Sequence, residues 1–319
     1  MVEQKSIICL GILVADVIGR PLHAVPAPGS LVLVDEMSLH TGGCAANAAT
    51  ALSKLGFPVE AIGKVGADPF GDFVISVLHE RGIGVRGVKR DPQVGTSVTM
   101  VMVDPDGERR FVHYIGANAA LTLDDIDFEQ ISQAAILHIG GSLVLPGIDG
   151  EPTAELLKKA QEAGVITSLD TVWDDTGRWM SLLEPSLPFM DFFIPSLPEA
   201  QEITGVDAPE KVARELIAQG VGTVVLKMGP DGCLVMTSDH EQLRMPAHDV
   251  EVVDATGAGD AFAAGFIAGI WQGWALERTT RFATAVGAMC VTGVGAAGSV
   301  SSLEETLQFM ETEPLKTYS

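Results

Sequence analysis

Residues 254–266 read Asp254-Ala-Thr-Gly-Ala-Gly-Asp260-Ala-Phe-Ala-Ala-Gly-Phe266. Small residues around the two glycines let backbone N–H groups approach an anion, and the helix expected at 260–272 would add partial positive charge at its N-terminus. Asp260 would lie beside that anion, where a carboxylate can accept the proton of a hydroxyl. The stretch therefore suits phosphoryl transfer to an alcohol. A plain helix start, with Asp260 at the helix dipole, is the alternative.

The bulk composition narrows the class of protein. The chain has 319 residues, is 47% hydrophobic and carries a net charge of −22. Such a length and composition are typical of one globular domain. The acidic charge argues against nucleic acid or an anionic membrane as a partner, although a local nest of N–H groups can still bind an anion.

The cysteines indicate a reducing compartment. They lie among apolar or small residues without Cys-x-x-Cys spacing, at Cys9, Cys44, Cys233 and Cys290. This is typical of buried thiols in a cytosolic protein. The first residues lack the basic and apolar regions of a signal peptide, and no apolar run is long enough to span a bilayer. We therefore expect a cytoplasmic protein.

Strand and helix patterns alternate along most of the chain. Apolar runs predict strands at 7–13, 59–65, 136–139, 166–170, 192–194 and 224–227. Helical spacing predicts helices at 45–55, 72–81, 153–163, 209–219, 260–272 and 279–291. Alternation of this kind predicts a three-layer α/β/α domain with a mostly parallel central sheet.

Two β-rich excursions interrupt this alternation. One covers 31–39, and the other covers 96–103 and 110–115 around the turn Asp104-Pro-Asp-Gly107. The second has the pattern of a β-hairpin.

The motifs of several other enzyme classes are absent from this sequence or stand in the wrong place. Gly-x-Gly-x-x-Gly occurs at 82–87, after a helix-like segment rather than a strand, and at 293–298, too near the C-terminus for a dinucleotide-binding unit. The sequence contains no P-loop, no zinc-ligand spacing and no Gly-x-Ser-x-Gly elbow.

A second stretch, at 41–56, must be considered together with 254–266. It reads Thr-Gly-Gly-Cys-Ala-Ala-Asn-Ala-Ala-Thr-Ala-Leu-Ser-Lys-Leu-Gly. Together the two stretches resemble the two signature motifs of the ribokinase-like (PfkB) carbohydrate kinases, and the resemblance extends along nearly the whole chain. It implies a single ribokinase-like α/β domain over 1–319, with β-sheet lid segments at about 14–40 and 94–118 inserted in it. It also implies ATP and Mg²⁺, with K⁺ as a further cofactor, a small sugar substrate and a homodimer formed through the lid.

The resemblance gives the second motif a catalytic role. Asp260 matches the family's base, and the N–H groups of Gly257, Ala258 and Gly259 would stabilise the transferring phosphoryl group. Asp254 and Thr256, also within this motif, match the positions around a bound monovalent cation. A carboxylate that caps its own turn is the alternative for Asp254.

The first motif and several scattered residues are implied to bind the substrate. These are Asp16, Gly42, Gly43, Asn47, Arg110, Asn118 and Asp170, with Arg109, Tyr114, Trp173 and Arg178 as further candidates for substrate selection. Glycines allow close approach, and Asp or Asn side chains pair with sugar hydroxyls. Arginine would suit an anionic sugar, but it also guards edge strands against aggregation.

Two further stretches resemble the nucleotide side. Phe193-Ile-Pro-Ser196-Leu-Pro-Glu199 is similar to the family's Asn-x-x-Glu region, in which Glu199 would organise Mg²⁺ through water and Ser196 replaces the usual Asn. Lys227-Met-Gly-Pro-Asp-Gly232 resembles the nucleotide-side strand and turn, with Lys227, Gly229 and Gly232 as nucleotide-binding residues. Lys227 would meet the phosphates of ATP or form a solvated strand end.

The sequence predicts an ATP-dependent sugar kinase that phosphorylates a primary hydroxyl of a monosaccharide or a close derivative. The alternatives are a nucleoside kinase on the same fold and a catalytically silent sugar-binding sensor. Ser196 in place of Asn supports the sensor. Asp260 and the N–H groups of Gly257, Ala258 and Gly259, which we call the glycine cradle, argue against it. A sensor needs no base beside an anion site.

Overall fold

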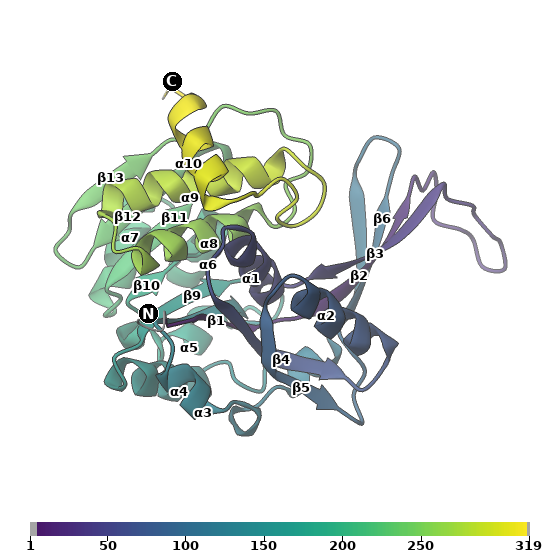
Figure 1. The fold of residues 1–319 in the computed structure, drawn as a ribbon, viewed down its shortest axis with the longest axis horizontal. Coiled ribbons are helices and arrows are strands. Elements are labelled where there is room, and N and C mark those ends of the chain that lie inside the picture. Colours follow the sequence, from purple (N-terminus) through teal and green to yellow (C-terminus); the bar gives the residue numbers. More distant parts are fainter. Residues whose placement is uncertain (1–4, 318–319) are drawn as a thin grey trace.

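The apolar runs of the chain pair side by side in one large sheet of a computed structural model that describes residues 5–317 (Figure 1). Within these residues the sheet has nine strands in the order β13-β12-β11-β10-β9-β8-β1-β4-β5. The strands from β5 across to β11 are parallel, and β12 and β13 are antiparallel. Their bounds are β1 Ile7–Gly11, β4 Val59–Gly66, β5 Gly84–Asp91, β8 Ile136–Ser142, β9 Ile166–Thr171, β10 Phe192–Phe193, β11 Thr223–Lys227, β12 Cys233–Thr237 and β13 Gln242–Met245.

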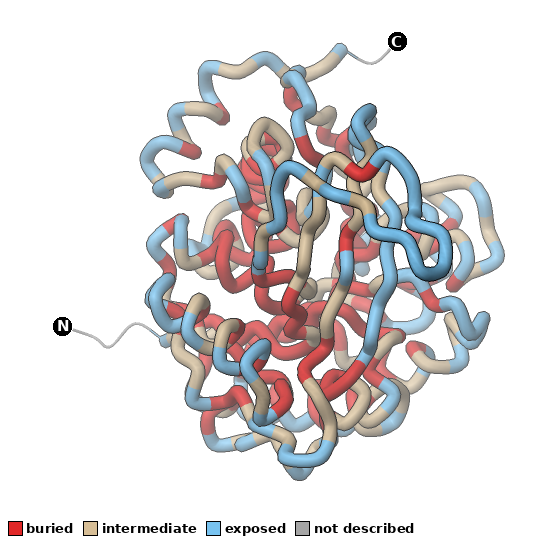
Figure 2. Tube along the Cα trace, turned by 90° about the vertical axis from the view of Figure 1, so that its right-hand side faces the viewer, coloured by how far each residue is buried: buried red, intermediate tan, exposed pale blue. Residues whose placement is uncertain are grey.

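Helices cover both faces of this sheet. On one face lie α1 Cys44–Lys54, α2 Pro69–Glu80, α8 Ala258–Trp271, α9 Leu276–Val291 and α10 Leu303–Thr312. On the other lie α3 Phe128–Ser132, α4 Glu151–Glu162, α5 Met180–Leu183, α6 Leu197–Thr204 and α7 Pro209–Ala218. Side chains alternate across a strand, so Ile7 and Cys9 of β1 enter one core and Ile8 and Leu10 the other. Figure 2 shows the buried residues gathered between these layers.

A smaller sheet projects beside the main one (Figure 1). Its order is β3-β2-β6-β7, with β2 Val14–Arg20, β3 Glu36–Gly42, β6 Val98–Val103 and β7 Arg109–Tyr114. The chain enters it directly after β1 and leaves it from β3 into α1. Asp104 to Gly107 form the turn between the antiparallel strands β6 and β7, as the sequence predicts.

The three-layer prediction is confirmed, and most predicted helices and strands lie within a few residues of their expected bounds. The excursion predicted at 31–39 forms a strand only from Glu36, because Leu31 and Leu33 are highly exposed and make no ladder. Residues 82–87 run into β5, an edge strand whose charged and glycine residues hide its β pattern. The strands β12 and β13 and the helices α6 and α10 are not anticipated by the sequence reading.

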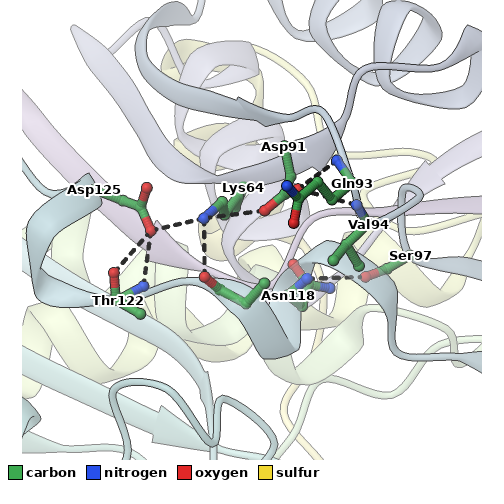
Figure 3. A network of polar contacts seen from close by, with 9 residues as sticks. Lys64, Asp91, Gln93, Val94, Ser97, Asn118, Thr122 and Asp125 are labelled. Atoms are coloured by element: carbon green, nitrogen blue, oxygen red, sulfur yellow. Dashed lines mark hydrogen bonds and ion pairs between the residues drawn. The ribbon is translucent and has the colours of Figure 1, made fainter.

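A partly buried lysine of the main sheet pairs with two carboxylates, one in the segment before β6 and one in the segment after β7 (Figure 3). Nζ of Lys64, on β4, lies 3.3 Å from Oδ2 of Asp91 and 3.0 Å from Oδ2 of Asp125. It also donates to the carbonyl of Ala120 at 3.0 Å. Burial lowers the pKa of Lys64, but the two carboxylates outweigh it and raise that pKa, so the side chain stays charged. The network holds the segment that returns from β7 to the main sheet.

Candidate active site

The turn before α8 requires a glycine. Gly257 is the N-cap of α8 with a φ of +74°, and a Cβ there would lie 2.6 Å from Cβ of Ala296. Asp254 fixes the approach to this turn, because its Oδ1 accepts from N of Thr256 at 2.8 Å and its Oδ2 from N of Gly295 at 2.9 Å. Among the described residues no side chain caps the start of α8, so its first N–H groups remain available to bind an anion. The turn fixes their position.

Asp260 lies in the first turn of α8 and meets the first motif. Nδ2 of Asn47, on α1, donates to Oδ2 of Asp260 at 2.8 Å. Burial raises the pKa of Asp260 above its ordinary value, while the bond from Asn47 and the charge of Lys227 lower it and only partly offset the burial. A carboxylate with a raised pKa is a better proton acceptor than an exposed one, so Asp260 has the properties of a general base.

A buried ion pair lies beside the glycine cradle. Nζ of Lys227, at the end of β11, lies 2.5 Å from Oδ2 of Asp170, at the end of β9. A Cβ on Gly259 would lie 3.4 Å from the same Nζ, so the ammonium group borders the cradle. Burial raises the pKa of Asp170 to about 7, and it also opposes the charge on Lys227. The carboxylates of Asp170, Glu199 and Asp260 outweigh that opposition and raise the pKa of Lys227, so the ammonium stays charged.

Ser196 and Glu199 form a capping box at the start of α6. Oε2 of Glu199 accepts from N of Ser196 at 3.0 Å, and N of Glu199 donates to Oγ of Ser196 at 3.4 Å. Oγ1 of Thr171 also donates to Oε2 of Glu199, at 3.1 Å. The Ser-x-x-Glu spacing is a readable capping signal in the sequence, and it accounts for a serine at this position.

Three cavities meet around these groups. The first, of about 630 Å³, lies between the smaller sheet and α1, and we call it the lid cavity. The second, of about 960 Å³, is lined by Asp170, Glu199 and Lys227, and we call it the central cavity. The third, of about 380 Å³, is mostly apolar, and we call it the apolar cavity. Asp260 and Gly257 line both the lid and central cavities, and Gly259 and Lys227 line both the central and apolar cavities.

The first motif shapes the lid cavity. A Cβ on Gly42 would lie 2.0 Å from Oδ2 of Asp16, and Gly43 has a φ of +92° with Ile12 O at 2.3 Å from a Cβ. Both positions thus need glycine for Asp16 and α1 to approach. Burial raises the pKa of Asp16, with smaller opposing effects from Thr99 and His113. Asp16, Asn47 and Asp260 line the cavity together and can pair with several hydroxyls.

Other predicted residues lie elsewhere. Asn118 is buried, and its amide pairs with the backbone of Leu13 in both directions at 3.1 Å. Arg110 pairs with Asp104 inside the hairpin at 2.6 Å. Asp170 lines the central cavity rather than the lid cavity. Lining residues of these cavities do not include Tyr114, Trp173 or Arg178; N of Arg178 donates to Asp174, which organises its own loop.

Two sets of cavity residues are not predicted by the sequence. The inward face of the smaller sheet contributes Thr99, His113 and His40 to the lid cavity. Alternation along β6 and β7 could have found Thr99 and His113, because Arg109, Phe111 and His113 share one face. The apolar cavity is lined from the loop before α8 and from α8 and α9, at Ala247, Val250, Val252, Ala255, Phe262, Ala288 and Val291. Apart from Ala255 and Phe262, which lie within 254–266, these residues belong to no motif and are brought together only by folding.

Comparisons with known proteins show the family of the chain. The profile described as pfkB family carbohydrate kinase matches residues 4–303. The chain belongs to this family. Fructokinase-1 of Zea mays is 31% identical over 289 residues, covering 85% of this chain and 88% of that protein. The 2-dehydro-3-deoxygluconokinase of Bacillus subtilis is 26% identical, covering 89% of this chain and 91% of that protein.

Solved structures extend the likeness to the fold. The ribokinase of Arabidopsis thaliana, complexed with ribose and ATP, has a TM-score of 0.83 and is 25% identical, over 96% of this chain and 99% of that one. The predictions of a ribokinase-like fold and of an ATP-dependent sugar kinase are confirmed, and the nucleoside kinase alternative is not favoured. No helix within residues 5–317 has the length and apolar character needed to cross a membrane.

Gly257 and Gly259 offer a matched pair of substitutions. Gly257→Ala should destabilise the fold by about 1–3 kcal/mol and abolish kinase activity, because alanine is strained at positive φ and its Cβ would clash with Ala296. Gly259→Ala should unfold like the wild type, because its Cβ would make only ordinary contacts, yet it should weaken ATP turnover by filling the cradle. Denaturant unfolding and steady-state kinetics test both. Equal stability of the two variants would contradict the assignment.

Asn47 should control the pH dependence of the reaction. Its bond favours the ionised form of Asp260, so Asn47→Ala should raise the pKa of Asp260 further. A base works only when ionised, so activity falls as the pH falls through that pKa, and the acid limb of kcat/KM should move to higher pH in the variant. Thr50→Ala, one turn further along α1, is the control, since Thr50 pairs with Arg81. An acid limb at the same pH in Asn47→Ala and the wild type would refute the coupling.

Proposed function

We propose that this kinase transfers the γ-phosphoryl group of ATP to a primary hydroxyl of a neutral monosaccharide bound in the lid cavity. One observation carries the proposal: Asp260 and Gly257 line both the lid cavity and the central cavity. A base and an anion cradle at that junction meet the hydroxyl from one side and the phosphate from the other. This arrangement supports in-line transfer between the two cavities.

The roles in the step follow from the contacts. Asp260 accepts the proton of the attacking hydroxyl, the new bond forms between that oxygen and the γ-phosphorus, and the bond to the β-phosphate oxygen breaks to release ADP. The N–H groups of Gly257, Ala258 and Gly259 stabilise charge on the transferring group. Lys227 borders the same cradle, and its ammonium supplies a charge that a helix N-terminus alone lacks.

The nucleotide is proposed to extend over the central and apolar cavities. The phosphates lie in the central cavity by Ser196 and Lys227, and the base enters the apolar cavity, to which Gly229 and Gly232 contribute. A Cβ on Gly232 would lie 2.0 Å from O of Met245, so only glycine fits that turn.

Mg²⁺ fits this site as an ion held mainly by phosphate and water. Among residues 5–317 no three His, Cys, Asp or Glu side chains are grouped to bind a metal. Mg²⁺ commonly keeps several waters and binds one or two carboxylates plus substrate phosphates. Glu199 and Asp170 line the central cavity and would hold such an ion through its waters. When bound, Mg²⁺ neutralises charge on the phosphates of ATP.

A neutral sugar is favoured because the two arginines that the smaller sheet contributes to the lid cavity already have carboxylate partners. Arg20 pairs with Glu36 at 2.8 Å, and Arg109 pairs with Asp254 at 2.6 Å. Hydroxyls of the sugar would instead meet Asp16 and Asn47, with Gly42 and Gly43 allowing close approach. Relatives named fructokinase support a neutral ketose as the substrate. A relative named 2-dehydro-3-deoxygluconokinase supports the competing class of substrate, a sugar acid.

We also propose a cytoplasmic homodimer. The four cysteines are free thiols, in keeping with a reducing compartment. The face of the smaller sheet turned away from the lid cavity exposes Met37 (69%), Met100 (51%), Val112 (58%) and Tyr114 (52%). Such an apolar face on a soluble protein marks an interaction surface, and a second copy of the same sheet would cover it.

ADP release tests the proposed reaction. Purified protein with Mg²⁺-ATP is assayed against neutral sugars, sugar acids, sugar phosphates and nucleosides. We expect turnover with a neutral monosaccharide, and a loss of about 10²–10⁴-fold in Asp260→Asn because a general base contributes that much. Asp231→Asn, an exposed change at the rim of the central cavity, is the matched control.

The outcomes separate the candidate functions. Retention of more than about a tenth of the turnover in Asp260→Asn would contradict its role as base. Preference for a sugar acid would overturn the neutral substrate. Stabilisation by sugar and ATP with no ADP release across the panel would indicate the silent sensor.

The dimer proposal predicts a change in mass. Val112→Glu places a charge on the outward face and should convert a dimer to a monomer in analytical ultracentrifugation, because the buried carboxylate would lose its hydration. Glu108→Gln, in the hairpin turn, serves as the control. A wild-type protein that sediments as a monomer at every concentration would contradict the proposed dimer.

A further inference from the structure

Arg109 reaches from the smaller sheet to the loop that precedes α8. It lies on β7, and its Nη2 is 2.6 Å from Oδ1 of Asp254. Its Nη1 donates to Oγ1 of Thr256. The Asp254 side chain is only 5% exposed and that of Arg109 30%, so the pair is shielded on the side of the carboxylate. An ion pair of this kind is stronger than an exposed one, because water screens it less.

The same contacts bear on whether a monovalent cation fits at Asp254 and Thr256, where the sequence predicts one. Oδ1 of Asp254 accepts from N of Thr256 and from Arg109, and Oδ2 accepts from N of Gly295. Oγ1 of Thr256 also faces the guanidinium. A cation needs these oxygens and would be repelled by the arginine beside it. With β7 in this position, the donor set does not fit a separate ion.

The position of Arg109 connects the smaller sheet to the glycine cradle. Thr256 directly precedes Gly257, whose left-handed turn starts α8, and Asp254 fixes the same turn through Thr256. Arg109 is opposite Val103 next to the hairpin turn, at the end of the sheet rather than at its base. Any movement of this hairpin away from the main sheet would withdraw the guanidinium from both residues.

We propose that Arg109 is a positioning residue that supplies, from the hairpin, the positive charge facing Asp254 and Thr256 in place of a monovalent cation. The charge is present only when the hairpin covers the lid cavity, so closure over the sugar also fixes the cradle for the phosphoryl group. The kinase then needs no added monovalent cation. This inference rests on the proposed function and names a device that the shared motifs alone do not require.

The test compares Arg109→Gln and Arg109→Lys with Arg110→Gln. Arg110 is the adjacent residue, and among residues 5–317 it pairs only with Asp104 of the same hairpin, which makes it the matched control. Phosphorylation is measured in K⁺, Na⁺ and tetramethylammonium salts at equal ionic strength. Thermal unfolding in the same salts, without sugar or ATP, gives a readout that is independent of turnover.

Wild type and Arg110→Gln should show the same kcat, within about twofold, in all three salts, and the same Tm. Arg109→Gln should lose roughly 10- to 100-fold in kcat in tetramethylammonium, as expected for a misplaced cradle. K⁺ should restore part of that loss and raise the Tm of this variant alone, because the vacated oxygens can then bind the ion. Arg109→Lys should remain less dependent on K⁺ than Arg109→Gln.

Two results would overturn the inference. One is a wild-type enzyme that requires K⁺ and whose Tm rises with K⁺. The other is an Arg109→Gln variant whose kcat and Tm respond to the three salts as the wild type does. Absence of turnover with every sugar would refute the proposed function instead, while the comparison of Tm values still tests Arg109.

Discussion

The hydrogen bond between Asn47 and Asp260 is the contact on which the site depends. It joins α1, which starts where the smaller sheet returns to the main one, to α8, which carries the glycine cradle. The two helices pack against each other, and small buried residues on them, among them Ala48, Ala261 and Ala264, allow the close approach that lets the short amide reach the carboxylate. Two stretches separated by more than half of the chain thereby face one junction between cavities.

One buried positive charge, that of Lys227, lies at this junction of an acidic molecule. The chain carries a net charge of −22, yet the central cavity is proposed to accept the phosphates of ATP. A buried ammonium at Lys227, kept charged by Asp170 and Glu199, supplies a local positive charge where the phosphates would lie. Because a buried charge is screened little by salt, the ammonium and the N–H groups of the cradle can attract a phosphate despite the acidic surface.

The smaller sheet has two faces with different tasks. Its inward face presents Asp16, His113 and Arg109 to the lid cavity, and its outward face exposes apolar side chains. Arg109 also reaches the loop before α8, so the sheet is coupled to the cradle by an ion pair as well as by the covering of the cavity. Recognition of the sugar and preparation of the anion site are thus linked through one hairpin.

The sequence by itself determined the alternating α/β core, the hairpin around Asp104 to Gly107 and the two glycine-containing motifs. These depend on period, turn chemistry and backbone freedom, all of which are local properties. Only the tertiary structure decided that Asn118 pairs with Leu13 and that Asp170 pairs with Lys227. It also decided that Arg109, and not its neighbour Arg110, reaches Asp254, because the strand alternates faces and only the packing of two sheets selects which face meets the site.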